Sequence, residues 1–194
     1  MARITVSLLV LILILAAFWL FAPKKQPIPL AAIGAKGSES WHDFSAPQDK
    51  FKIRLPSLPH HATETVEDPQ THEKRLYDFF LASKEDGTIF AVNTIRFPEK
   101  KEGAAYDQQF LRNFIQQMLL SNPLNKIKSM NDSTLKGNQA IDFKVENAEV
   151  TIDGKAFFDE NTLYILSATA RNDRPIAPEY ATFIDSFQLP EKKH

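Results

Sequence analysis

Histidine is the residue type in this chain best suited to chemistry, because a neutral imidazole binds metals and titrates near neutral pH. Two of the five histidines, His60 and His61, follow a strand and a proline turn in the segment FKIRLPSLPHH. Adjacent residues of an extended segment point to opposite faces, so His60 and His61 are poorly placed to bind one metal ion together. A metal site would require one of them to meet His72 across a hairpin.

That site would also need further ligands, because zinc is bound by three or four side chains that converge on it. His42, Glu64 and Asp68 are the candidates, and His72 lies in the loop VEDPQTHEK. The strands of the required hairpin would be residues 62–66 and 74–82. The favoured interpretation is that the histidines are exposed loop residues, and His60, His61 and His72 remain the candidate metal ligands.

Other catalytic chemistry finds little support in the sequence. The chain has no cysteine, which excludes a thiolate metal site, a cysteine nucleophile and a lipid-modified cysteine. There is no G-x-S-x-G segment, and the six glycines are scattered singly, so no phosphate-binding loop is present. The paired acids at residues 67–68 and 159–160 fall on expected turns. Turns are normally exposed to solvent, whereas a catalytic pair of carboxylates needs burial. We therefore expect no catalytic residue, no cofactor and no enzymatic activity.

The balance of charge argues against nucleic-acid binding. The chain carries 23 basic and 24 acidic residues, a net charge of -1. Binding to a phosphate backbone requires a dense basic surface, and the two Lys-Lys pairs in the domain are each next to glutamate. A solvated surface is the simpler interpretation of both pairs.

The N-terminal segment carries the clearest signal in the chain. Ile4 to Ala22 is a run of 19 residues without a charge. As a helix it would span about 28 Å, close to the hydrocarbon core of a bilayer. The run is longer than the apolar region of most signal peptides, and Pro23 and two lysines follow it, a poor cleavage site. Residues 1–22 are therefore expected to be an uncleaved membrane anchor, with a cleaved signal as the alternative.

The remainder divides into a flexible linker, residues 23–40, and one α+β domain, residues 41–190. Alternating apolar residues predict strands, and apolar residues three and four apart predict helices. The expected order is four strands, a helix at about 105–121, four more strands and a short closing helix. Residues 126–135 are expected at an edge of the sheet, residues 163–170 at its centre, and Asp153-Gly154 is expected to form a bulge or a turn.

The layout resembles a known family. Trp41 and Phe44, followed by Phe51-x-Ile53-x-Leu55-Pro56-x-x-Pro59, resemble the opening of PsbP-like domains, also called the Mog/PsbP superfamily. Later segments are similar too: Leu135-x-Gly137-x-x-Ala140-x-x-Phe143, Leu163-Tyr164-x-Leu166 and Phe183-x-x-Ser186-Phe187-x-Leu189. The resemblance covers about residues 41–190 and implies an antiparallel sheet sandwiched by helices. It also implies a binding or assembly role, with no residue assignments that can be carried over.

Three functions follow as expectations. The first is a non-catalytic interaction or assembly module of a bacterial cell envelope, bound to the membrane through residues 4–22 and to a protein partner. Its domain would lie on the periplasmic side of the inner membrane, although the flanking charges at Arg3 and Lys24–Lys25 are nearly equal. The second is a metal-binding protein or metal-dependent enzyme that uses His60, His61 and His72. The third is a carrier of a small ligand in a groove between sheet and helix.

Overall fold

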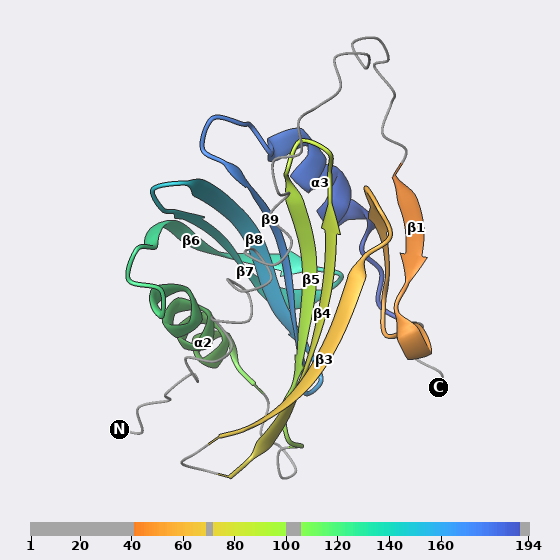
Figure 1. Cartoon of the computed structure of the whole chain (residues 1–194). Helices are drawn as coiled ribbons and strands as arrows, with labels where there is room; N and C mark the ends of the chain where they lie inside the picture. Colours follow the sequence, from red (N-terminus) through yellow and green to blue (C-terminus); the bar gives the residue numbers. More distant parts are fainter. Residues whose placement is uncertain (1–40, 69–71, 100–105, 191–194) are drawn as a thin grey trace.

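The computed structural model describes residues 41–68, 72–99 and 106–190. The expected membrane anchor, residues 1–22, and the expected linker, residues 23–40, lie outside the described residues. The described part is an antiparallel sheet with one helix on each face, which is the α+β layout that the sequence predicts (Figure 1).

Seven strands form the main sheet, in the order β3-β4-β5-β9-β8-β7-β6. Their bounds are β3 His60–Glu67, β4 Lys74–Ser83, β5 Ile89–Arg96, β6 Lys126–Leu135, β7 Asn138–Glu146, β8 Val150–Asp159 and β9 Thr162–Arg171. The predictions for two strands are confirmed: β9 lies at the centre of the order and β6 at one edge. The continuous apolar run of β9 is explained by burial of both its faces.

Tight turns join neighbouring strands where the sequence places turn residues. Lys136 and Gly137 connect β6 to β7 with φ angles of 50° and 83°. Two consecutive residues with positive φ match the right-handed twist of the flanking strands, and glycine adopts this conformation without steric cost. Glu160, with φ of 55°, makes the corresponding turn between β8 and β9. The two predicted hairpins at these turns are confirmed.

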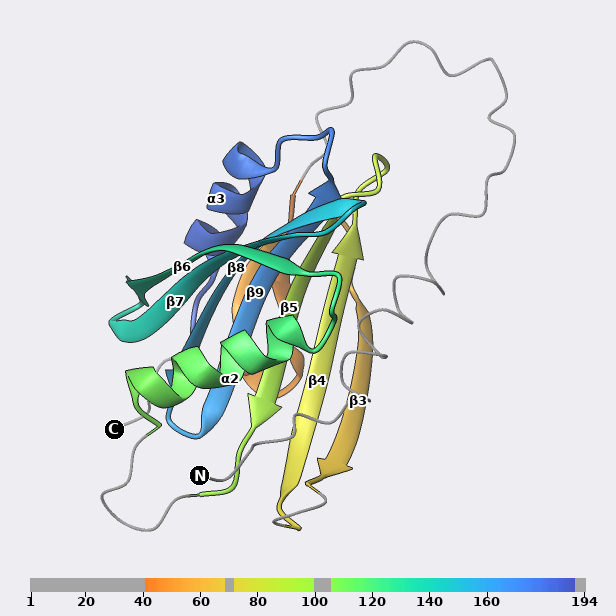
Figure 2. The same ribbon diagram turned by 90° about the vertical axis from the view of Figure 1, so that its left-hand side faces the viewer.

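One helix covers each face of the sheet (Figure 2). Helix α2, Gln108–Leu120, begins at Asp107, whose carboxylate accepts a 2.7 Å hydrogen bond from the backbone N–H of Phe110. Helix α3, Ala177–Ser186, lies on the other face. Both helices were predicted from the sequence. The predicted start of α2, at about residue 105, is three residues too early, because Asp107 caps the helix and the helix begins only after it.

The aromatic side chains divide between two apolar clusters, one on each face. Phe80 and Phe157 pack in the cluster beneath α3, whereas Phe79 and Phe158 pack against the cluster beneath α2. This division follows from the alternation of side chains along a strand. The aromatic content of the chain is therefore largely used for packing.

The first strands differ from the prediction. The segment before α2 holds five strands, and the first two form a separate ribbon of β1 (His42–Ser45) and β2 (Lys52–Leu55), with the short 3₁₀ helix η1 (Pro47–Asp49) between them. Phe51, Ile53 and Leu55 are buried as predicted, but against the face of the main sheet. Alternation specifies that one side of a strand is buried and does not specify its hydrogen-bonded neighbour, so the prediction of a single meander was wrong.

Gly154 also differs from the prediction. It lies within β8, opposite Phe143, in a continuous register and not in a bulge or turn. A Cβ atom at Gly154 would lie 2.1 Å from Cζ of the Phe143 ring, so glycine is needed because the ring crosses the strand there. The irregularity in register lies between Ile127 and Ser129 of β6.

Candidate functional site

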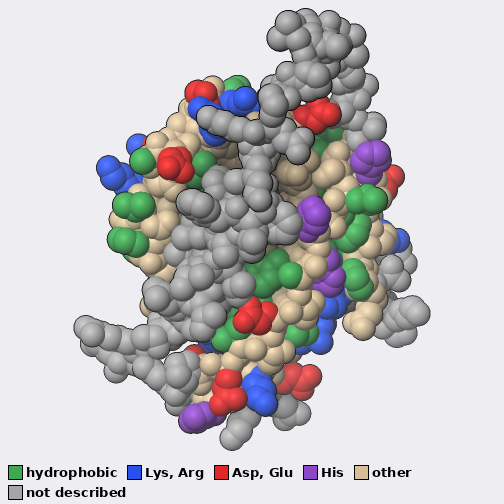
Figure 3. All heavy atoms as spheres, viewed as in Figure 1, with side chains coloured by type: hydrophobic (Ala, Val, Ile, Leu, Met, Phe, Trp, Pro, Cys, Tyr) green, Lys and Arg blue, Asp and Glu red, His purple; other side chains and the backbone are tan. Residues whose placement is uncertain are grey.

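The structure separates the candidate metal ligands. His60 and His61 begin β3, opposite Leu81 and Phe80, whereas His72 follows the other end of the same strand. The six residue steps of extended strand from His61 to Glu67 span about 20 Å. The requirement that His72 meet one of the first two histidines across the hairpin is not fulfilled. In the space-filling view, histidine atoms at the bottom of the molecule lie far from the histidine atoms on its right-hand side (Figure 3).

Each separated ligand candidate has local contacts of its own. Nδ1 of His72 lies 2.9 Å from a carboxylate oxygen of Glu67, and Asp68 lies 3.3 Å from the guanidinium of Arg75. His42 pairs with Leu55 in the ribbon. Within residues 41–68, 72–99 and 106–190, no three histidine or acidic side chains are grouped so that they could hold a metal ion.

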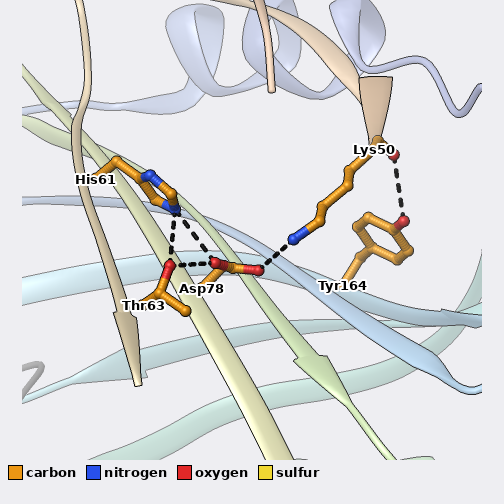
Figure 4. A network of polar contacts seen from close by, with 5 residues as sticks. All are labelled: Lys50, His61, Thr63, Asp78 and Tyr164. Atoms are coloured by element: carbon orange, nitrogen blue, oxygen red, sulfur yellow. Dashed lines mark hydrogen bonds and ion pairs between the residues drawn. The ribbon is translucent and has the colours of Figure 1, made fainter. Parts of the chain in front are cut away.

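His61 belongs instead to a polar network centred on the buried carboxylate of Asp78 in β4 (Figure 4). Lys50, Thr63 and His61 lie 2.7, 2.6 and 3.2 Å from its two oxygens. The imidazole stacks on Phe80, with ring centroids 4.3 Å apart and planes inclined by 4°. We call these four polar residues, Lys50, His61, Thr63 and Asp78, the Asp78 clamp.

Neighbouring strands supply the clamp through their register. Thr63 stands opposite Asp78, and His61 stands opposite Phe80, so all of these side chains share one face of the sheet. Lys50 reaches them from the segment between η1 and β2, and its carbonyl accepts a 3.3 Å hydrogen bond from the Tyr164 hydroxyl. Burial, assisted by the charge of Asp159, raises the pKa of Tyr164 to about 12 and keeps it a neutral donor. The clamp therefore joins the ribbon to the sheet.

The electrostatics of Asp78 follow from these contacts. Its side chain is only 5% exposed, and this burial alone would raise its pKa. The hydrogen bonds from Lys50, Thr63 and His61 outweigh burial and hold the pKa of Asp78 below its usual value. Asp78 is therefore a carboxylate in the folded protein near neutral pH.

The clamp does not have the geometry of a catalytic triad, although it contains a hydroxyl, an imidazole and a carboxylate. The same atom, Nε2 of His61, lies 3.2 Å from both Thr63 Oγ1 and Asp78 Oδ1. A triad requires the two ring nitrogens to contact the nucleophile and the carboxylate separately. Moreover, Thr63 donates its proton to Asp78. The network is a structural contact and not a nucleophile activated by a base.

A second polar region lies on the same face, between α3 and strands β7 and β8. This depression, which we call the α3 groove, has a volume of about 340 Å³. Its principal lining residues are Asp142 and Lys144 of β7, Asp153 and Lys155 of β8, and Tyr180 and Ile184 of α3. A volume of this size is at the lower end of the range for ligand pockets and suits a small group or a single side chain.

Cross-strand register arranges the four charges of the α3 groove alternately. Asp142 stands opposite Lys155, and Lys144 stands opposite Asp153. The Lys155 ammonium lies 2.8 Å from Asp142, 3.2 Å from the Ser133 hydroxyl and 3.3 Å from the Thr134 carbonyl. Lys155 is therefore fully occupied by the fold.

The other polar groups of the α3 groove are less well satisfied. Asp153 is 19% exposed, and the ammonium of Lys144 lies 3.5 Å from it, longer than an ordinary charge-assisted hydrogen bond. The hydroxyl of Tyr180 is buried and has no hydrogen-bond partner in the described part of the chain. Burial, followed by the charges of Asp142 and Asp153, raises the pKa of Tyr180, so the phenol stays neutral. A buried hydroxyl without a partner costs free energy.

Sequence reasoning did not single out the residues of this groove. A signal was present, because the pattern Asp-x-Lys occurs twice, at Asp142 to Lys144 and at Asp153 to Lys155. On neighbouring antiparallel strands, two such patterns place each acid opposite a base.

In the part of the chain that the structure describes, neither helix combines the length and apolar character needed to cross a bilayer. The predicted anchor, residues 4–22, lies outside that part.

The chain was compared with known proteins. No family model matches it, and neither does any curated protein. Among solved structures, it is similar to the solution structure of cyanobacterial PsbP (CyanoP) from Synechocystis sp. PCC 6803, with 15% identity and a TM-score of 0.47, covering 84% of this chain and 99% of that chain. It is also similar to a crystal structure from Bacteroides thetaiotaomicron VPI-5482, with 13% identity and a TM-score of 0.38, covering 79% of this chain and 50% of that chain.

Proposed function

We propose that this chain is a non-catalytic binding module of a bacterial cell envelope, and that the α3 groove is the place where its protein partner binds. The observation that carries the proposal is the incomplete satisfaction of polar groups in this groove, above all the buried Tyr180 hydroxyl without a partner. Native proteins pair nearly all buried polar groups, so an exception at a surface depression points to a group supplied from outside.

The chemistry of the described residues supports a role in binding rather than catalysis. Asp78 and His61, the pair most like catalytic machinery, are engaged in joining the ribbon to the sheet. The α3 groove holds acids, lysines and a phenol, and one of its lysines, Lys155, forms a 2.8 Å ion pair with Asp142. Carboxylates, an ammonium and a phenol at a surface depression are groups that bind a charged or hydrogen-bonding partner.

We further propose that residues 4–22 anchor the module in the inner membrane, with residues 41–190 on the periplasmic side. The uncharged run of 19 residues in the sequence supports this arrangement. Since the chain has no cysteine, a Ser40→Cys variant carries a unique thiol at the C-terminal end of the expected linker. We expect a membrane-impermeant maleimide to label this thiol in intact spheroplasts. Labelling only after the membrane is broken would contradict the proposed topology.

Photo-crosslinking in intact membranes tests the binding function. A photoreactive amino acid replaces Ala181, an exposed residue of α3 at the groove, in one variant of the full chain. The matched control places it at Gln116, an exposed residue of α2 on the opposite face. We expect a discrete adduct from position 181 that position 116 does not give. Equal patterns, or no adduct from position 181, would contradict binding at the α3 groove.

A further inference from the structure

The α3 groove has more acceptors to offer a ligand than donors. Its lining includes the acids Asp142, Asp153 and Asp185 and the bases Lys144 and Lys155. Lys155 is 12% exposed and already has three oxygen partners, so it has no donor to spare. With the Lys155–Asp142 pair set aside, the lining retains one lysine, Lys144, and two carboxylates, Asp153 and Asp185. The free charge of the groove is acidic.

Asp153 is the acceptor most in need of a partner. Its carboxylate is 19% exposed, and the nearest cation among the described residues, the Lys144 ammonium, lies 3.5 Å away. A partly buried carboxylate loses part of its hydration, and a close hydrogen bond to a donor compensates for that loss. The contact with Lys144 is too long to provide one, and Lys144 itself is 44% exposed and free to turn toward solvent.

Tyr180 adds a third acceptor from the helix side. Its hydroxyl is buried without a partner, and the charges of Asp142 and Asp153 both act on it. A phenol oxygen accepts hydrogen bonds, and this phenol stays neutral. The carboxylates on the sheet and the phenol on α3 therefore face the same small volume.

A primary ammonium matches these acceptors. It has three N–H donors, and the groove offers three acceptor groups in Asp142, Asp153 and the Tyr180 hydroxyl. The apolar side chain of Ile184, which also lines the groove, can pack against an aliphatic stem. The volume of about 340 Å³ fits one long side chain better than a cofactor.

We infer that the α3 groove binds the ammonium of a lysine side chain presented by the partner protein. This inference rests on the proposed binding function and names the chemistry of the partner. In the complex, the incoming ammonium displaces Lys144 from Asp153 and gives the Tyr180 hydroxyl its missing hydrogen bond. A carboxylate ligand is disfavoured because Asp153 and Asp185 would repel it.

The experiment is a ligand-observed NMR titration of the full-length chain in detergent micelles. The probe is Nα-acetyl-lysine methylamide, and the matched probes are the norleucine analogue, which lacks the charge, and the glutamate analogue, which reverses it. We expect weak saturable binding of the lysine probe alone. Asp153→Asn should weaken this binding about tenfold or more, the effect of one hydrogen bond to a charged group, and Tyr180→Phe about three- to tenfold.

The control variant is Asp43→Asn, which removes an acid that is 95% exposed in the ribbon. It should leave the affinity unchanged, and far-ultraviolet circular dichroism should show that all variants are folded.

Absence of saturable binding, equal binding of the glutamate probe, or affinities unaffected by Asp153→Asn and Tyr180→Phe would overturn the inference. If position 181 crosslinks to a partner while the lysine probe fails, the binding function stands and the lysine assignment is wrong. If the probe binds without any crosslink, the groove recognises a primary ammonium, but its assignment to a partner protein is wrong.

Discussion

The Asp78 clamp and the α3 groove lie on the same face of the sheet, yet their polar atoms are satisfied to different degrees. In the clamp, one buried carboxylate receives hydrogen bonds from Lys50, Thr63 and His61. In the groove, Asp153 has a single distant cation and the Tyr180 hydroxyl has no partner among the described residues. A complete network stabilises a fold, whereas an incomplete one lowers stability and leaves binding capacity. The two regions should therefore respond in opposite ways to mutation.

Removal of the central carboxylate of the clamp should have the largest effect. We expect Asp78→Ala to lower the free energy of unfolding by about 3 kcal/mol, because the Lys50 ammonium and the Thr63 hydroxyl lose their buried partner. Urea denaturation followed by circular dichroism measures this loss. Asp43→Ala is the matched control, since Asp43 is an exposed acid whose nearest guanidinium nitrogen, in Arg54, is 3.8 Å away; it should cost less than about 0.5 kcal/mol. A cost for Asp78→Ala no greater than that of the control would contradict a stabilising role for the clamp.

Acid should remove the contribution of the same carboxylate. The pKa of Asp78 is lower in the folded protein than in the unfolded chain, so the unfolded state takes up its proton first. The stability that Asp78 provides is therefore present above about pH 4 and is lost as the pH falls through its lowered pKa. We expect the difference in unfolding free energy between wild type and Asp78→Asn to narrow below about pH 4. A difference that is constant from pH 3 to pH 7 would mean that the charge of Asp78 does not stabilise the fold.

Removal of the His61 imidazole should lower the free energy of unfolding by less than removal of the Asp78 carboxylate. His61→Ala eliminates one hydrogen bond to Asp78 and the stacking on Phe80, which together should cost about 1–2 kcal/mol. His60→Ala, at the neighbouring position of β3 on the opposite face, is the comparison variant. If both variants lost the same free energy of unfolding, the contact between His61 and Asp78 would not contribute measurably to stability.

The smallest change in stability, and one of opposite sign, is expected in the groove. Tyr180→Phe removes a buried hydroxyl that has no partner in the described structure, while the ring stays in place. The free energy of unfolding should remain equal to that of wild type or rise by up to about 1 kcal/mol. A loss greater than about 1 kcal/mol would show that the hydroxyl has a structural partner, and the groove would then be a closed network like the clamp.

The sequence predicts the layers of this fold better than it predicts how the first two strands pair. Burial of Phe51, Ile53 and Leu55 follows from alternation, but their pairing in a ribbon depends on contacts with the distant residues Gln188 and Phe187. The central place of β9 was predictable because a strand buried on both faces is apolar throughout. Local patterns thus identify which residues are buried, and long-range packing decides what covers them.

Neither polar region could be assembled from the sequence alone. His61 was recognised as a candidate ligand, but its carboxylate is 17 residues away and the lysine on that carboxylate is 28 residues from it. In the groove, alternating Asp and Lys on two strands are typical of an ordinary solvated face. Only the register of β7 against β8, and the placement of Tyr180 over them, reveals that the face is partly enclosed.

The contrast between clamp and groove is tested most directly by measuring both stability and lysine-probe affinity for His61→Ala and Tyr180→Phe. We predict a crossover: His61→Ala unfolds at a lower urea concentration with unchanged affinity for the probe, and Tyr180→Phe keeps or gains stability while its affinity falls about three- to tenfold. If stability and affinity decline together in both variants, the two regions are not distinct, and the assignment of one to folding and the other to binding is wrong.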